Sequence, residues 1–387
     1  MRIVLDASIL YRNWLLDTPD FRVLEKHMAL GRSELFVPEI ALLETISNYR
    51  KEVRRHLASL GKLRRLVPSM SGSEAVPDLE EICDAYRETL HARLESLGAQ
   101  IPSHGHVPHD VLVTRALEVR KPFRESDKGY RDCLLWEVIL RSAARRGVKT
   151  IFVSDNYHDF GAEPDGHGLH GHLRADLARA DLPEDCVELY RSLHDLIREV
   201  IAADLETAVD EIATSLRDGS YAGFSLLTWF TEHRSDLTSS PGDWIGGAFD
   251  FLVELESPEV VNIEAPERED ICVEDVLRID DERVVLYAVA DADLTVDAFV
   301  FKADYYGLED RCPLQIMDRD WNDHYMWVQI EVKLPLHFSL TLNVITNEVE
   351  QHEVHSAGGI FGWCPHCCQP ILNDAAETCR HCGAAFF

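Results

Sequence analysis

The sequence predicts an α/β fold: a parallel sheet with flanking helices in the first 200 residues, then a small antiparallel β-domain and a cysteine-rich segment. Short apolar runs alternate with amphipathic segments up to residue 200, which indicates a parallel sheet covered by helices. Between residues 326 and 344, apolar and polar residues alternate with period two, which indicates strands with one buried face. Two Cys-x-x-Cys pairs follow residue 363.

The elements of the first 200 residues follow from local patterns. Residues 3–5, 34–37 and 150–154 are short apolar runs and are expected to be strands. Proline, serine and glycine predict loops at residues 67–76 and 98–109. Helical periodicity predicts helices around residues 40–53, 79–97, 131–146 and 186–205.

The remaining chain changes from a helical to a strand pattern. The alternation on both sides of Pro335 predicts a hairpin that turns at this proline, and residues 284–289 and 294–301 predict two more strands. The expected domains are residues 1–200, a helical connector at 201–250, an antiparallel β-domain at 251–355 and a cysteine-rich module at 361–387.

The net charge of -30 is unevenly distributed. Residues 1–200 carry 28 basic and 32 acidic side chains, whereas residues 201–387 carry 10 and 36. Because phosphate binding needs lysine and arginine, any nucleic-acid contact is expected from the first part. The acidic second part is also explained by solubility alone.

The N-terminal residues predict a strand rather than a signal peptide, and no apolar stretch approaches the roughly 18 residues of a membrane span. Five of the ten cysteines lie within residues 364–382, and the others are scattered as reduced thiols would be. We therefore expect a cytoplasmic protein without membrane contact.

Carboxylates follow two of the expected strands. Asp6 comes directly after the first strand, and Asp155 follows the strand near residue 150. The carboxyl ends of parallel strands are where open sheets build their sites. Each aspartate is also explained as the N-cap of the next helix.

Asp132 shares one stripe of an amphipathic helix with Leu135, Trp136 and Ile139. A carboxylate that faces a core must be paired or bind a metal. Its place near the start of a helix also explains an aspartate through the helix dipole. Glu44 alone is typical of a solvated helix residue.

Four segments in this order resemble the motifs of PIN domains. Residues 4–8 resemble the opening strand motif, and residues 35–44 resemble the second strand with the glutamate-bearing helix. Residues 121–132 are similar to a subgroup found in larger bacterial proteins, and residues 152–160 resemble the last motif. The resemblance covers about residues 1–200 and implies a PIN-like sheet.

The resemblance implies an endoribonuclease that uses Mg²⁺ or Mn²⁺ held by Asp6, Glu44 and Asp132, with Asp155 as a fourth ligand. Hard divalent cations prefer such oxygen ligands, and they activate water for attack on a phosphodiester. The sequence has Asn156 where the family often has an acid, so Asn156 or Asp159 is an alternative ligand. Ser154 is expected to orient a water or a carboxylate.

Two basic clusters are candidate RNA contacts. The larger continues from the helix that bears Glu44, and the smaller precedes the helix of Asp132. The larger cluster is also explained as a solvated helix face. The candidates are Arg50, Lys51, Arg54, Arg55, Arg120 and Lys121.

Two Cys-x-x-Cys pairs with eleven residues between them are typical of a structural zinc ribbon. The expected Zn²⁺ ligands are Cys364, Cys367, Cys379 and Cys382.

The resulting hypothesis is a metal-dependent endoribonuclease that binds RNA and contacts a protein partner through the β-domain or zinc ribbon, as a stress-response or phage-defence effector. The alternatives are a non-catalytic PIN-like scaffold that binds RNA or protein, and a structure-specific DNA nuclease.

Overall fold

The computed structural model divides the chain into two compact units, Met1–Asp204 and Leu205–Phe387, which are described separately. It describes the backbone, and side chains except at residues 61–66, 204 and 246, of residues 1–11, 13–66, 78–124, 128–144, 148–162, 166–205, 215–216, 220–238, 244–249, 255–305, 313–360, 362–364, 370–372, 378–379 and 382–385. The loop expected at residues 67–76 and Cys367 lie outside these ranges.

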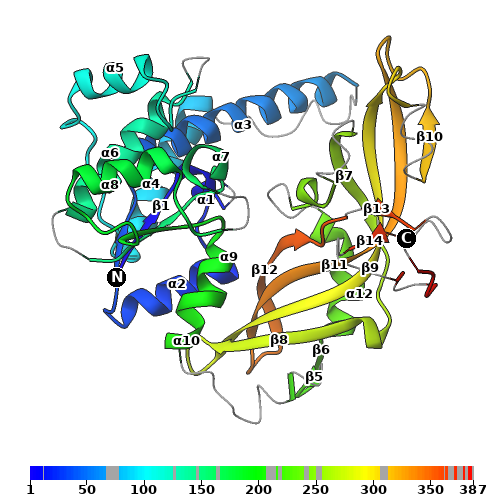
Figure 1. Cartoon of the computed structure of the whole chain (residues 1–387). Coiled ribbons are helices and arrows are strands. Elements are labelled where there is room, and N and C mark those ends of the chain that lie inside the picture. Colours follow the sequence, from blue (N-terminus) through cyan, green and yellow to red (C-terminus); the bar gives the residue numbers. More distant parts are fainter. Residues whose placement is uncertain are drawn as a thin grey trace. The chain divides into compact units, whose positions relative to one another are not determined.

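In the first unit, helices lie around a parallel sheet (Figure 1). Its elements are β1 (Arg2–Leu5), α1 (Ala7–Leu10), α2 (Pro19–Ala29), β2 (Glu34–Phe36), α3 (Glu39–Leu66), α4 (Leu79–Ser96), α5 (His109–Leu117), α6 (Tyr130–Ala144), β3 (Thr150–Val153), α7 (Tyr157–Phe160), α8 (Gly171–Arg179), β4 (Val187–Tyr190), α9 (Leu193–Leu196), the π-helix η2 (Ile197–Ile201) and α10 (Ala202–Asp204).

The sheet has the order β2-β1-β3-β4, and every pairing is parallel. Residues of β1 and β3 are all buried, as expected for strands covered on both faces. The predicted stripe of α6 packs against one of these faces: Leu135, Trp136 and Ile139 share a core cluster with Val4 and Phe152. The predicted α/β class is therefore confirmed for this unit.

The helix expected over residues 186–205 is wrong at its start. Residues Val187–Tyr190 form β4, which pairs with β3 so that Leu189 lies opposite Phe152. Helical structure begins only at Leu193. The short apolar alternation of these residues fits a strand because β3 has an edge with which they can pair. Local periodicity does not reveal such an edge.

The second unit contains a six-stranded antiparallel sheet. Its elements are β5 (Ser220–Tyr221), β6 (Phe224–Ser225), α12 (Leu226–Thr238), the 3-10 helices η3 (Gly246–Phe249) and η4 (Arg268–Asp270), β7 (Leu255–Ile263), β8 (Ile271–Arg278), β9 (Arg283–Phe301), β10 (Leu314–Asp318), β11 (Tyr325–Asn343), β12 (Glu348–Ala357), β13 (Gly362–Trp363) and β14 (Pro370–Ile371).

The hairpin predicted around Pro335 is wrong, because this proline lies inside the continuous strand β11. Strand β11 pairs along its length with β9, which also replaces the two separate strands expected over residues 284–301. On the other side of β11, β10 ends its pairing at Ile330 and β12 begins at Leu336. Among the described residues, Pro335 therefore lies in the gap between the segments of β11 that pair with β10 and with β12. A proline, which lacks an N–H, is tolerated at such a position.

The helix α12 belongs to the core of the second unit. Trp229 and Phe230 are in the same buried cluster as Phe338 of β11, and α12 packs against β7. The expected domain limits, including a connector at residues 201–250, stay predictions. The expected succession of an antiparallel sheet region and a small cysteine region is confirmed.

Candidate functional site

Asp6 and Ser154 follow the neighbouring strands β1 and β3. Leu5 is paired with Val153, and the amide of Asp6 donates to the Val153 carbonyl at 3.0 Å. The strand β2 lies on one side of β1 and β3 on the other, so these ends form a topological switch point of the sheet. Open α/β sheets bind ligands at such points.

The Asp6 carboxylate is buried and held by neutral donors. It accepts hydrogen bonds from the backbone of Ala7 at 2.6 Å and from the hydroxyls of Ser8 at 3.1 Å and Ser154 at 2.6 Å. The Ser8 and Ser154 hydroxyls in turn accept from the amides of Asp155 and Asn156. The loop after β3 therefore fixes the orientation of Asp6.

Two further carboxylates come from helices that pack against each other. Glu44 lies near the start of α3, and Asp132 lies in the first turn of α6. Arg131 pairs with Glu44, and the amide nitrogen of Asn156 donates to Asp132 at 3.3 Å.

Burial and neighbouring acidic charges raise the pKa of each of these three carboxylates. Burial is the main cause that raises the pKa of Asp6, and the charge of Asp155 adds to it. Burial also raises the pKa of Glu44 against the opposing Arg131, and Asp6 contributes further. Burial, Asp6, Asp159 and Glu44 raise the pKa of Asp132 to about 6. Clustered carboxylates with raised pKa values suit a divalent cation, because it offsets their repulsion.

The other acidic candidates differ from this trio. Asp155 is one third exposed, and its Oδ1 lies 3.8 Å from Nη2 of Arg191. Asp159 is buried and forms ion pairs with Lys121 and Arg124, and these lower its pKa despite its burial. Asn156 donates to both Asp132 and Asp159 and so links the two.

Most of the predicted RNA-contacting cations have partners within the protein. Arg50 pairs with Glu80, Arg55 pairs with Glu52, and Lys51 donates to Asn48 at 3.0 Å. Arg54 is exposed on the same helix. The side chains of Lys62, Arg64 and Arg65, which extend this cluster, lie outside the described residues.

The second basic cluster faces a buried carboxylate that the sequence analysis missed. Asp176 of α8 accepts from Arg115, Arg120 and Arg179 and from the indole of Trp136 at 3.0 Å. Arg120, predicted to bind RNA, is thus anchored inside the first unit. No local signal identifies this network, because its members come from four segments of the chain.

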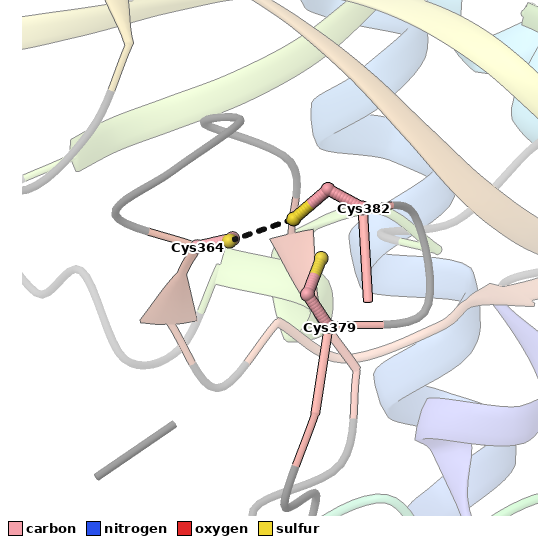
Figure 2. Close-up of side chains that lie close together, drawn as sticks. All are labelled: Cys364, Cys379 and Cys382. Carbon is pink, nitrogen blue, oxygen red and sulfur yellow. Dashed lines mark hydrogen bonds between the residues drawn. The ribbon is translucent and has the colours of Figure 1, made fainter. Parts of the chain in front are cut away.

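Three cysteine thiols of the second unit converge (Figure 2). The sulfur atoms of Cys364, Cys379 and Cys382 lie within 4.8 Å of one another, and those of Cys364 and Cys382 are 3.7 Å apart. Cys364 and Cys379 are buried. Three converging thiols form a cluster that could hold a soft metal such as zinc.

Residues 3–160 match the PIN domain family, a match that covers less than half of the chain. The first unit therefore carries a PIN domain, and domains of this family are typically metal-dependent nucleases. No curated protein and no solved structure matches the chain. Among the helices of the described residues, none is both long and apolar enough to span a membrane.

Proposed function

We propose that the protein is a metal-dependent endoribonuclease that hydrolyses RNA phosphodiesters at Asp6, Glu44 and Asp132. The observation that carries the proposal is the electrostatic interaction among three carboxylates at the end of β1, on α3 and on α6, with Arg131 as the cation paired to one of them. Such an arrangement is costly for a folded chain unless a cation binds there.

The proposed ligands fit Mg²⁺ or Mn²⁺, which prefer oxygen atoms. When bound, such an ion acidifies a water molecule and stabilises the charge that develops on the phosphate. Ser8 and Ser154 hold the Asp6 carboxylate in one orientation, so it needs little rearrangement to act as a ligand. Asp155 at the same sheet edge is proposed as the fourth ligand, although its side chain is more exposed than that of Asp6.

A cleavage assay tests this function. Purified protein is incubated with single-stranded RNA and DNA in Mg²⁺, in Mn²⁺ and in EDTA. We expect RNA cleavage that EDTA abolishes. Asp6→Asn and Asp132→Asn should each reduce it by more than about 100-fold, since even partners of metal ligands contribute 10–100-fold. Asp84→Asn, which removes an exposed carboxylate paired with Arg87, is the matched control and should cleave normally.

Each other outcome identifies an alternative. Cleavage of DNA but not RNA would indicate a DNA nuclease. RNA binding without cleavage in either metal would indicate a non-catalytic scaffold. Full cleavage by Asp132→Asn would contradict the proposed site.

We also propose that Cys364, Cys379 and Cys382, together with Cys367, hold one structural Zn²⁺, and that this module or the β-domain contacts a protein partner. A small ribbon depends on its metal for folding. Metal analysis should find about one zinc per chain, lost in Cys379→Ser and retained when the exposed Cys272 is replaced in Cys272→Ser. RNA cleavage should persist in both variants, because the proposed nuclease site lies in the first unit.

A further inference from the structure

The buried Asp159 carboxylate has no acceptor position left for a metal ion. Its Oδ1 accepts from Nζ of Lys121 at 3.0 Å and from Nε of Arg124 at 2.7 Å. Its Oδ2 accepts from Nη2 of Arg124 and from Nδ2 of Asn156 at 3.1 Å. An ionised carboxylate offers about four lone-pair sites, and these four bonds use them. Asp159 therefore acts as a counter-ion.

The segment that carries both cations is fixed in place. The Lys121 carbonyl accepts from Arg115 at 2.6 Å, and the Lys121 amide donates to Nδ1 of His172 at 3.0 Å. Phe123 is buried in a cluster under α6. Gly129 has a φ of 105°, and a Cβ at this position would overlap the Pro122 carbonyl oxygen. Anchoring on several sides lowers the entropy that Lys121 and Arg124 would lose on binding a ligand.

Arg124 lies at the border of the carboxylate site. Asn156 donates to Asp132 and Asp159 with the same nitrogen, so these two carboxylates are near neighbours. Asp132 also interacts electrostatically with Arg124. The Arg124 side chain is 46% exposed, whereas the side chain of its partner Asp159 is 2% exposed. Nε and Nη2 make this ion pair, and Nη1 has no partner among the described residues.

We propose that Arg124, oriented by Asp159 and flanked by Lys121, binds a phosphate of the RNA backbone next to the metal-binding carboxylates. The inference rests on the proposed function. Arg131 and one divalent cation only balance the three carboxylates, so the site keeps no net positive charge to attract a phosphodiester. A guanidinium held side-on by one carboxylate keeps another N–H for a phosphate oxygen, and arginine suits this geometry.

The test measures RNA binding apart from catalysis. A single-stranded oligoribonucleotide is titrated in Ca²⁺, which occupies oxygen sites, at several salt concentrations. Arg124→Gln should weaken binding by about tenfold and reduce the slope of log K against log salt by about one. The matched control is Arg179→Gln, which removes an exposed arginine that also pairs with a buried aspartate. It should change neither quantity.

Metal binding supplies the second readout. Asp159→Asn and Arg124→Gln should keep the full rise in melting temperature that Mg²⁺ causes in the parent, because neither residue is a ligand. A smaller rise in Asp159→Asn would show that Asp159 is a ligand and overturn its role as counter-ion. Unchanged RNA affinity and salt slope in Arg124→Gln would reduce Arg124 to a structural ion pair.

Two further variants separate the possible failures. Arg124→Lys keeps the charge and should bind RNA more tightly than Arg124→Gln, whatever the stability of the latter. Loss of the Mg²⁺ response in Asp132→Asn supports the nuclease site independently of Arg124. Failure at Arg124 alone therefore overturns only this inference, whereas an unchanged Mg²⁺ response in Asp132→Asn overturns the proposed function.

Discussion

Two groups of buried and partly buried carboxylates in the first unit are neutralised in different ways. Asp176 accepts from three arginines and an indole, and Arg115, the most buried of these arginines, also pairs with Glu137. Asp6 accepts hydrogen bonds from neutral donors, and Asp132 accepts one from an amide. The Asp176 group carries its own positive charge, whereas the Asp6 group has Arg131 for three carboxylates.

This difference separates a structural network from a candidate binding site. A buried charge is tolerated when it is paired and hydrogen-bonded, and each pair in the Asp176 network then depends on its partner. Carboxylates that raise one another's pKa reduce the stability of the metal-free protein at neutral pH. Such a cost is typical of a functional site, where a ligand supplies the missing charge.

The largest change in stability is expected from breaking the ion pairs of Asp176. Asp176→Asn should lower the free energy of unfolding of the first unit by about 3–5 kcal/mol, because it leaves the buried Arg115 guanidinium without its main counter-charge. Urea denaturation measures the change. The exposed ion pair between Asp84 and Arg87 offers a control, since Asp84→Asn should lower the free energy of unfolding by less than about 1 kcal/mol. Equal effects of the two variants would contradict the comparison.

A gain in stability, rather than a loss, is expected when a carboxylate is removed from the group of Asp6, Glu44 and Asp132. The pKa of Asp132 is about 6 in the folded protein and 3.8 in the reference state, so the folded state binds this proton more tightly. Stability from this group is present below pH 4 and is lost as the pH rises through 6. In EDTA at pH 7, Asp132→Asn should therefore be more stable than the parent, on the order of 1–3 kcal/mol.

Thermal unfolding between pH 4 and pH 7.5 measures this prediction. The advantage of Asp132→Asn should disappear toward pH 4, and saturating Mg²⁺ should reverse it at pH 7 by stabilising the parent. A variant that is less stable than the parent at every pH would indicate that Asp132 is a structural cap of α6.

The smallest effect concerns cations on the surface. Arg54 is exposed on α3, and Arg55 pairs with Glu52 on the same helix. Arg120, by contrast, pairs with the buried Asp176. Reversal of both Arg54 and Arg55 to Glu should weaken RNA binding severalfold and flatten its salt dependence, because fewer counter-ions are released. Arg87→Glu on α4 is the control. An unchanged salt slope would mean that this helix does not contact RNA.

Local patterns predicted the strands at the start of the chain and near residue 150, and the inward stripe of α6. These depend on short-range alternation and on burial of adjacent apolar residues. The same reasoning fails at Pro335, where it predicts a turn inside a continuous strand. The apolar residues nevertheless keep the same parity from Met326 to Leu342, which a turn would have interrupted. This parity was the available signal for one continuous strand.

Local patterns in the sequence were enough to predict the α/β class of the first unit, the acidic residues at strand ends and the cysteine spacing. Which charges meet depends on how distant segments pack. Asp159 forms ion pairs with Lys121 and Arg124, and Asp176 forms ion pairs with Arg115 and Arg120. Among the described residues, no cation pairs with Asp6, which accepts hydrogen bonds from neutral donors. Secondary structure depends on neighbours along the chain, whereas pairing of buried charges depends on segments that pack together from distant positions. For this reason the sequence named candidate carboxylates but not their counter-charges.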